Sequence, residues 1–255
     1  MTKMPVLFIG HGSPINAIED NKYTREWKDI ALRIPRPAAI LSVSAHWFTI
    51  GTRVMDNAYP QMIYDIYGFP PELYEVVYPA PGAPELAKQA NRLLGGISQM
   101  DRGWGFDHGT WSVLHVMFPA AEIPIFQVSV DQNASPETHY EIGKRLAPLR
   151  ELDVLILGSG NVVHNLGLVD FERNGGYRWA EEFDRFIVDA IRSGDHSKVL
   201  EYLQAGESAR KSVPTLDHFA PLLTALGASG KSRDIQVFNE DCTLGSISMT
   251  SYLFG

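Results

Sequence analysis

Three of the eight histidines in this 255-residue sequence follow short apolar runs, in positions where their side chains could act together. They are His11, His46 and His164. Imidazole is the commonest metal ligand in proteins and the usual acid or base near neutral pH. If the apolar runs are parallel strands, all three imidazoles lie beyond strand carboxyl ends, where open α/β sheets bind ligands. The pattern favours one shared metal or catalytic site over three unrelated loop histidines.

Two further histidines have unusual neighbours. His108 stands between Asp107 and a predicted helix start, in Phe-Asp-His-Gly-Thr-Trp, so that the Asp107 carboxylate could orient its ring. His218 directly precedes a predicted apolar helix. Taken alone, either residue is more often structural than functional. The other histidines fall in predicted helices or a polar turn and are expected to be structural or solvent-facing: His115, His139 and His196.

Glycines surround two of the strand-end histidines and let the backbone approach a ligand closely. Gly10 and Gly12 flank His11, and a Gly-Ser-Gly stretch precedes His164. A phosphate-binding loop is the competing interpretation. The sequence has neither the Gly-x-Gly-x-x-Gly pattern nor a Walker pattern with its lysine, so we prefer a metal or catalytic site.

The elements that must position these residues form an alternating pattern. Short apolar runs bounded by Gly, Ser or Pro alternate with stretches of helical periodicity, which is typical of repeated βα units. Because strands covered on both faces are rich in β-branched residues and Leu, we predict central strands at residues 6–9, 39–44, 125–130 and 154–157. The predicted fold class is α/β: one domain over residues 1–255, with a central, mostly parallel sheet flanked by helices and the active site at the carboxyl ends of the strands.

Two helices and one long loop complete the pattern. Ser135 caps a predicted helix that begins at Pro136. Residues 179–191 form a predicted amphipathic helix that ends before Gly194, and its aromatic stripe is expected to pack in the core rather than against a cofactor. Residues 56–84, rich in Tyr and Pro, indicate a long ordered loop. Such a loop is either a lid or binding loop or a packed surface Ω-loop.

The composition limits the partners. A net charge of -8 and a pI of about 5.5 argue against binding to nucleic acid or an anionic membrane, because phosphate binding needs clustered Lys and Arg. Cys242 is the only cysteine, which excludes an internal disulfide and a thiolate-rich metal cluster. The first apolar run, residues 6–9, is too short for a signal sequence or a membrane span. We therefore expect a cytoplasmic protein that acts on small molecules, as a monomer or a homodimer.

Four histidine motifs occur in series and carry a resemblance to a known family. They are Gly-His-Gly-Ser-Pro at 10–14, Ser-Ala-His-Trp at 44–47, Phe-Asp-His-Gly-Thr-Trp at 106–111 and Ser-Gly-Asn-Val-Val-His-Asn at 159–165. In this order and spacing they resemble the class III extradiol ring-cleaving dioxygenases, in the branch named 4,5-DOPA dioxygenase. The likeness runs from about residue 5 to a closing Gly-Ser-Ile-Ser-Met at 245–249, and so covers essentially the whole chain.

The resemblance implies a non-haem Fe(II) enzyme that binds a catechol, such as L-DOPA, together with O2 and cleaves the ring beside the diol. By this likeness His11 and His46 match metal ligands and His218 matches the third protein ligand. His164 matches a residue beside the metal that is either an acid or base or a fourth ligand. His108 matches a histidine near the substrate that shares the proton work with His164.

The third ligand departs from the pattern of two histidines and a carboxylate that is common in the wider superfamily. An all-histidine site also suits Zn(II), which gives two alternatives: a zinc-dependent hydrolase and a non-catalytic metal-binding protein on the same fold. Aromatic side chains near the motifs could wall a pocket for a flat ring or belong to the core: Trp47, Trp104, Phe106 and Trp111. Four arginines could bind a substrate carboxylate or pair at the surface: Arg25, Arg33, Arg36 and Arg53.

Overall fold

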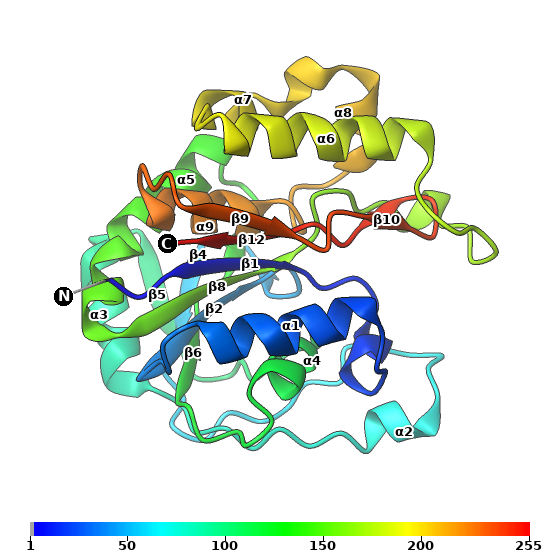
Figure 1. The fold of residues 1–255 in the computed structure, drawn as a ribbon. Helices are drawn as coiled ribbons and strands as arrows, with labels where there is room; N and C mark the ends of the chain where they lie inside the picture. Colours follow the sequence, from blue (N-terminus) through cyan, green and yellow to red (C-terminus); the bar gives the residue numbers. More distant parts are fainter. Residues whose placement is uncertain (1–2) are drawn as a thin grey trace.

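The computed structural model describes residues 3–255 and folds them around one six-stranded sheet (Figure 1). In spatial order its strands are β6 (Ile125–Gln127), β2 (Ala39–Ser44), β8 (Val154–Gly160), β1 (Val6–Gly10), β12 (Ser251–Phe254) and β9 (Ile235–Phe238). The first four run parallel, β12 is antiparallel to β1, and β9 is antiparallel to β12. The predicted α/β fold with a mostly parallel central sheet is confirmed. Met1 and Thr2, at the start of the predicted domain, lie outside the described residues.

The predicted strands agree with the sheet, with one correction. β2 has the predicted bounds, whereas β1 and β8 continue into Gly10 and Gly160. The predicted strand at 125–130 is wrong in its second half, because β6 ends at Gln127. The chain then leaves the edge of β2, and residues 130–131 form β7 (Val130–Asp131), which pairs with β3 (Phe48–Thr49). The apolar run at 125–130 is therefore divided between the main sheet, through β6, and the small sheet formed by β3 and β7.

Helices cover both faces of the sheet (Figure 1). Successive residues of a strand face opposite sides, and β8 shows this where it ends. Gly158 and Gly160 face the chain around α9 (Ala220–Ser229), whereas the Ser159 hydroxyl donates to Gly109 O at 2.5 Å, in α4 (His108–Met117). An added Cβ at Gly160 would lie 2.2 Å from His218 O. Glycine at this position lets the segment before α9 pack directly against β8.

The two helices predicted from their caps and periodicity are present. Ser135 Oγ accepts the Thr138 N–H at the start of α5 (Pro136–Leu146). The amphipathic helix is α6 (Arg178–Arg192), and its apolar face, including Phe183 and Ile187, is buried in the core as expected. Figure 1 shows α6 on the far side of β9 and β12 from α1 (Lys22–Arg33).

The loop at residues 56–84 is ordered, as predicted, and contains one short helix, α2 (Pro71–Tyr74). Residues 61–63 pair with Phe106: its N–H donates to Gln61 O at 2.8 Å, and Ile63 N–H donates to Phe106 O at 2.7 Å. The indole of Trp111 donates to Ile63 O at 3.0 Å. These bonds fix the loop beside the start of α4.

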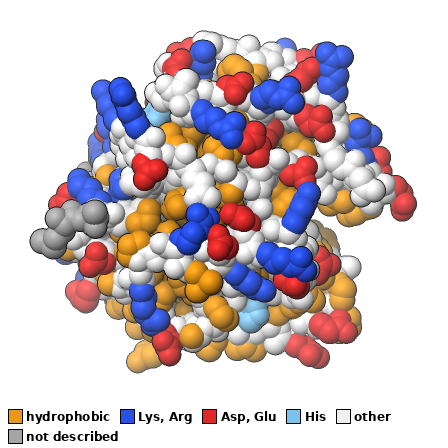
Figure 2. All heavy atoms as spheres, viewed as in Figure 1, with side chains coloured by type: hydrophobic (Ala, Val, Ile, Leu, Met, Phe, Trp, Pro, Cys, Tyr) orange, Lys and Arg blue, Asp and Glu red, His pale blue; other side chains and the backbone are white. Residues whose placement is uncertain are grey.

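The remaining elements lie around this core. They are β4 (Thr52–Met55), α3 (Pro84–Leu94), β5 (Ser98–Asp101), α7 (His196–Leu200), α8 (Glu207–Ser212), β10 (Cys242–Thr243), β11 (Ile247–Ser248) and four 3-10 turns at Pro14–Ala17, Ala147–Leu152, Leu166–Leu168 and Tyr202–Ala205. Within residues 3–255, none of the helices has the length and apolar character needed to cross a membrane. On the face shown in Figure 2, acidic and basic side chains are interspersed over the surface.

Candidate metal centre

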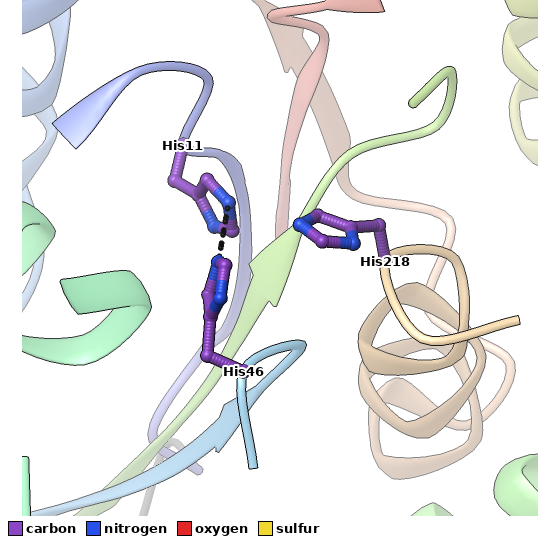
Figure 3. Close-up of side chains that lie close together, drawn as sticks. All are labelled: His11, His46 and His218. Atoms are coloured by element: carbon purple, nitrogen blue, oxygen red, sulfur yellow. Dashed lines mark hydrogen bonds between the residues drawn. The ribbon is translucent and has the colours of Figure 1, made fainter. Parts of the chain in front are cut away.

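His11, His46 and His218 meet at the carboxyl edge of the sheet (Figure 3). His11 follows β1, His46 follows β2, and His218 stands just before α9. Their ring centroids form a nearly equilateral triangle with sides of 5.0, 5.1 and 5.3 Å. One ligand nitrogen from each ring lies within 4.8 Å of the other two. The structure thus brings together His11 and His46, two of the three strand-end histidines, with His218, which the family resemblance implied as the third ligand.

The Nδ1 atom of each of these rings faces an oxygen. His11 Nδ1 is 3.0 Å from Ser159 Oγ. His46 Nδ1 is 3.4 Å from Asp65 Oδ2, and His218 Nδ1 is 2.7 Å from Asp217 Oδ2. Histidines that bind metals through one nitrogen usually donate the other N–H to such a partner. This arrangement leaves the three Nε2 atoms to face one another.

The Ser159 hydroxyl determines how His11 carries its proton. Because that hydroxyl donates to Gly109 O, its oxygen accepts from the Nδ1–H of His11. The lone pair of His11 is then on Nε2, which points to His46 Nε2 at 3.3 Å. Two nitrogens bound at tetrahedral angles to one Zn(II), each at about 2.1 Å, lie roughly 3.4 Å apart. The observed separation suits two ligands of one ion.

Burial favours the neutral form of all three imidazoles. It lowers the pKa of His11, His46 and His218 well below the ordinary histidine value, and the neighbouring histidines add to this effect by charge repulsion. Neutral imidazole is the form that binds metals. His218 Nε2 is buried and has no hydrogen-bond partner among residues 3–255. Because an unpaired buried polar atom is costly, a cation accepting this lone pair fits the site.

His164 lies against the outer face of His218. The two rings are stacked at 9° with centroids 3.4 Å apart. Burial lowers the pKa of His164 to about 4, with Asp217 opposing the shift and His108 adding to it. His164 also forms a second group of possible ligands with Asp217 and His218, within 4.8 Å. It therefore flanks the cluster of three histidines without belonging to it.

His108 lies on the other side of the cluster. Its ring centroid is 3.7 Å from that of His46 and 5.9 Å from that of His11. Its Nδ1 is 3.0 Å from Asp65 Oδ2, and its backbone N–H donates to Asp65 Oδ1 at 2.9 Å. His46, Asp65 and His108 form the third group of possible metal ligands.

The prediction that Asp107 orients the His108 ring is wrong. Asp107 caps α4, where Oδ1 accepts from the Thr110 N–H at 3.1 Å and from the Ser44 hydroxyl at 2.5 Å. Oδ2 accepts from the Trp104 indole at 3.1 Å. A capping carboxylate turns back toward the amides of the first helical turn, and so away from the ring of the following residue.

Two carboxylates of the site were not predicted. Asp65 comes from the loop at 56–84, and no motif in the sequence marks it. Burial alone would raise the pKa of Asp65, but its hydrogen bond to His108 and the charges of His108 and His46 lower it below its ordinary value. Asp217 is adjacent to His218 in sequence, and such a neighbour more often points elsewhere. Here its carboxylate contacts the His218 ring.

The three histidines expected to be structural, and the remaining aromatic and arginine candidates, lie outside the cluster. His139 Nε2 is 3.2 Å from Asp131 O, His196 Nδ1 is 2.9 Å from the Tyr140 hydroxyl, and the His115 ring packs near Tyr78. Phe106 and Trp111 are fully buried core residues. Each arginine forms an ion pair: Arg25 with Asp20, Arg33 with Glu26 and Asp29, Arg36 with Glu122, and Arg53 with Asp101.

Trp47 and Trp104 are stacked at 5° with centroids 5.6 Å apart. Together with Arg53 and Asp101 they line a cavity of about 370 Å³. None of the site histidines lines this cavity, so it does not test the prediction that these aromatic side chains wall a substrate pocket.

The fold and the site define an α/β protein with a cluster of histidines that could hold a metal ion at the carboxyl edge of its sheet. Comparison with known proteins gives the family. Residues 5–255 match the family model described as the catalytic LigB subunit of aromatic ring-opening dioxygenase. The chain belongs to this family, and by homology it is an extradiol ring-cleaving dioxygenase.

Relatives of similar length support this assignment. The chain is 43% identical to a protein of Escherichia coli (strain K12) named 4,5-DOPA dioxygenase extradiol, over 100% of this chain and 96% of the relative. A protein of the same name from Beta vulgaris is 36% identical, over 97% and 95%. A crystal structure described as uncharacterized protein JW3007 from Escherichia coli K12 has a TM-score of 0.87 and 40% identity, covering 99% of this chain and 100% of that one.

Proposed function

We propose that residues 1–255 act as one catalytic domain that uses Fe(II) and O2 to cleave the ring of a catechol, such as L-DOPA, next to its diol. The convergence of three imidazoles, each with an oxygen facing its Nδ1, is the observation that carries the proposal. The family model and the relatives named 4,5-DOPA dioxygenase extradiol support the reaction and the substrate class.

His11, His46 and His218 would hold the metal. A three-histidine set leaves coordination positions open, and it brings no negative charge of its own, so a catechol dianion would balance the charge of the ion. When bound, Fe(II) would acidify the catechol hydroxyls and allow electrons to pass from the catechol to O2. Zn(II) fits the same donors but has no redox chemistry, so zinc-loaded protein is expected to bind catechol without consuming O2.

Two histidines beside the cluster would handle protons. His164 lies against His218 and His108 lies against His46, so one imidazole stands on each side of the donor set. A positioned imidazole can accept a proton from a catechol hydroxyl and return one to an oxygen of the product. We propose His164 as the main acid or base and His108 as the second. A fourth ligand role for His164 is the alternative.

An oxygen-electrode assay tests this function. Protein reconstituted with Fe(II) under anaerobic conditions is mixed with aerated L-DOPA or simpler catechols, and we expect O2 uptake in step with a yellow ring-opened product. His11→Ala should abolish both signals, whereas His196→Ala, a change outside the site, should retain them. Lack of O2 uptake across a catechol panel, with iron bound, would refute the proposal.

The affinity of a three-histidine site for Zn(II) supports one competing function. A zinc hydrolase would use the same imidazoles to activate water and would act on an ester under argon. Oxygen dependence separates the two activities. Metal binding without turnover in either assay would point to a binding protein on this fold.

A further inference from the structure

We infer that Asp65 is a positioning residue that holds His46 and His108 in a fixed relationship through a single carboxylate. This inference rests on the proposed function, because it assigns Asp65 a role in a metal centre built on His46. The observation is that Asp65 Oδ2 lies 3.4 Å from His46 Nδ1 and 3.0 Å from His108 Nδ1, two charge contacts that lack the geometry of a hydrogen bond.

The carboxylate is itself held from two directions. Its Oδ1 accepts the backbone N–H of His108, the first residue of α4, and a helix start favours negative charge. On the loop side, the N–H of Ile63 and the indole of Trp111 fix the backbone two residues away. The Tyr64 hydroxyl donates to Val76 O at 2.6 Å and ties the loop to itself. Asp65 therefore has little freedom to move away from the two rings.

The pattern around the three central histidines gives Asp65 its role. Ser159 holds the Nδ1 of His11 and Asp217 holds that of His218. Asp65 is the corresponding partner of His46, and an oxygen acceptor at Nδ1 leaves Nε2 free for the ion. Asp65 also lies 3.0 Å from the Nδ1 of His108, a residue outside the cluster. One side chain thus places a ligand and a proton-handling group relative to each other.

The long loop gains a defined function from this contact. Residues 56–84 bring one carboxylate to the metal centre, and the tyrosines and prolines around it form the ordered frame that places it there. Within the described residues, Asp65 is the carboxylate that contacts both the His46 and the His108 ring. The loop therefore contributes to the site, in addition to packing on the surface.

Cobalt binding tests the inference by a readout that is independent of turnover. Co(II) absorbs visible light in a way that depends on its ligand geometry. We compare wild type, Asp65→Asn, Asp65→Ala and Glu75→Gln, which removes a charge from an exposed part of the same loop. Metal content, Co(II) affinity, the Co(II) spectrum and the thermal midpoint are measured. Turnover number and KM for L-DOPA are then measured on the Fe(II) forms.

We expect both Asp65 variants to bind Co(II) about 10–100-fold more weakly than wild type, with an altered spectrum. The turnover number should fall by a similar factor, with KM changed less. Asp65→Asn should keep the thermal midpoint near that of Glu75→Gln, because its amide oxygen can still accept the His108 N–H. Asp65→Ala removes every contact of the carboxylate. If this variant fails to fold, the Asn variant alone decides the outcome.

Several results would overturn the inference. One is an Asp65→Asn variant whose Co(II) affinity or turnover number stays within about threefold of wild type. Another is a second Co(II) ion per chain in wild type that is lost in Asp65→Asn, since Asp65 would then be a ligand. Failure of the proposed function looks different: wild-type protein itself would bind no metal, or would bind iron without consuming O2 with any catechol.

Discussion

The imidazoles of His164 and His218 are stacked face to face, with centroids 3.4 Å apart and 9° between their planes. Asp217 contacts the Nδ1 of His218, so the His218 ring is held at its edge by a carboxylate and on one face by a second imidazole. His164 therefore stands next to a proposed ligand. Because His164, Asp217 and His218 offer donor atoms within 4.8 Å of one another, a ligand role and a proton-transfer role are both open to His164.

The first prediction concerns His164. His164→Ala should lower the turnover number with a catechol by about two to four orders of magnitude, the range for loss of a general acid or base. Iron content should stay near one per chain, because the three central histidines remain. Steady-state kinetics and metal analysis of the same preparation measure both effects, with His196→Ala as the control. Loss of iron together with turnover would instead make His164 a fourth ligand.

The second prediction concerns the partner of His218. Asp217→Asn should weaken Co(II) or Fe(II) binding by about 10–100-fold, since the carboxylate that accepts from His218 Nδ1 is replaced by a weaker partner. Competition with a chelator measures the affinity. Glu207→Gln removes a carboxylate from an exposed ion pair with Lys211 and should leave the affinity unchanged. Equal affinities of Asp217→Asn and wild type would exclude a role for this contact.

The third prediction concerns the close approach at the end of β8. A Cβ at position 160 would lie 2.2 Å from His218 O, so Gly160→Ala should displace the segment that carries His218. Forcing such a clash typically lowers the free energy of unfolding by about 1–3 kcal/mol. Metal affinity should fall as well. Chemical denaturation and metal titration of Gly160→Ala and of Gly103→Ala, where only an aspartate side chain lies near, test this account.

The fourth prediction concerns pH and stability. Asp184 of α6 accepts hydrogen bonds from Ser248 and Thr250 at 2.6 and 2.7 Å, yet burial raises its pKa to about 6 against these bonds. The native state then binds more protons than the unfolded state between about pH 4 and pH 6. Stability from this group is present at low pH and is lost as the pH rises through 6.

Asp184→Asn should therefore change the stability profile. Relative to the variant, wild type should lose about 1 kcal/mol of unfolding free energy between pH 5 and pH 8. Urea denaturation of both proteins at the two pH values provides the measurement. Parallel profiles for the two proteins would mean that Asp184 ionises in the native state as it does in the unfolded chain.

The sequence is enough to predict where the strand-end histidines lie, because their place at the edge of the sheet follows from topology alone. A residue that follows a parallel strand lies at the carboxyl edge whatever its neighbours are, which places His11 and His46 together. His218 does not follow a strand, and its ligand role was expected only from the family resemblance. The strands β9 and β12 were not predicted, because neither sequence, Ile-Gln-Val-Phe or Ser-Tyr-Leu-Phe, is an unbroken run of β-branched residues and Leu.

Partners of the imidazole rings were the least predictable part. Asp107 stands beside His108 in sequence, and the direction of its side chain was set by helix capping rather than by proximity. Asp65 reaches the same ring from a loop whose path depends on the pairing of residues 61–63 with Phe106. Periodicity and motif spacing carry no information on such contacts, since they depend on how loops pack after the sheet has formed.

The oxygens that hold the three central rings come from β8, from the loop at 56–84 and from the segment before α9. An ion bound between these rings would act as a reversible cross-link between the first fifth of the chain and its last quarter, in a protein whose single cysteine allows no internal disulfide. The native state would gain about 2.7 kcal/mol at a free metal concentration one hundred times Kd. Metal supply would then determine how long the protein survives proteolysis, in addition to how fast it turns over.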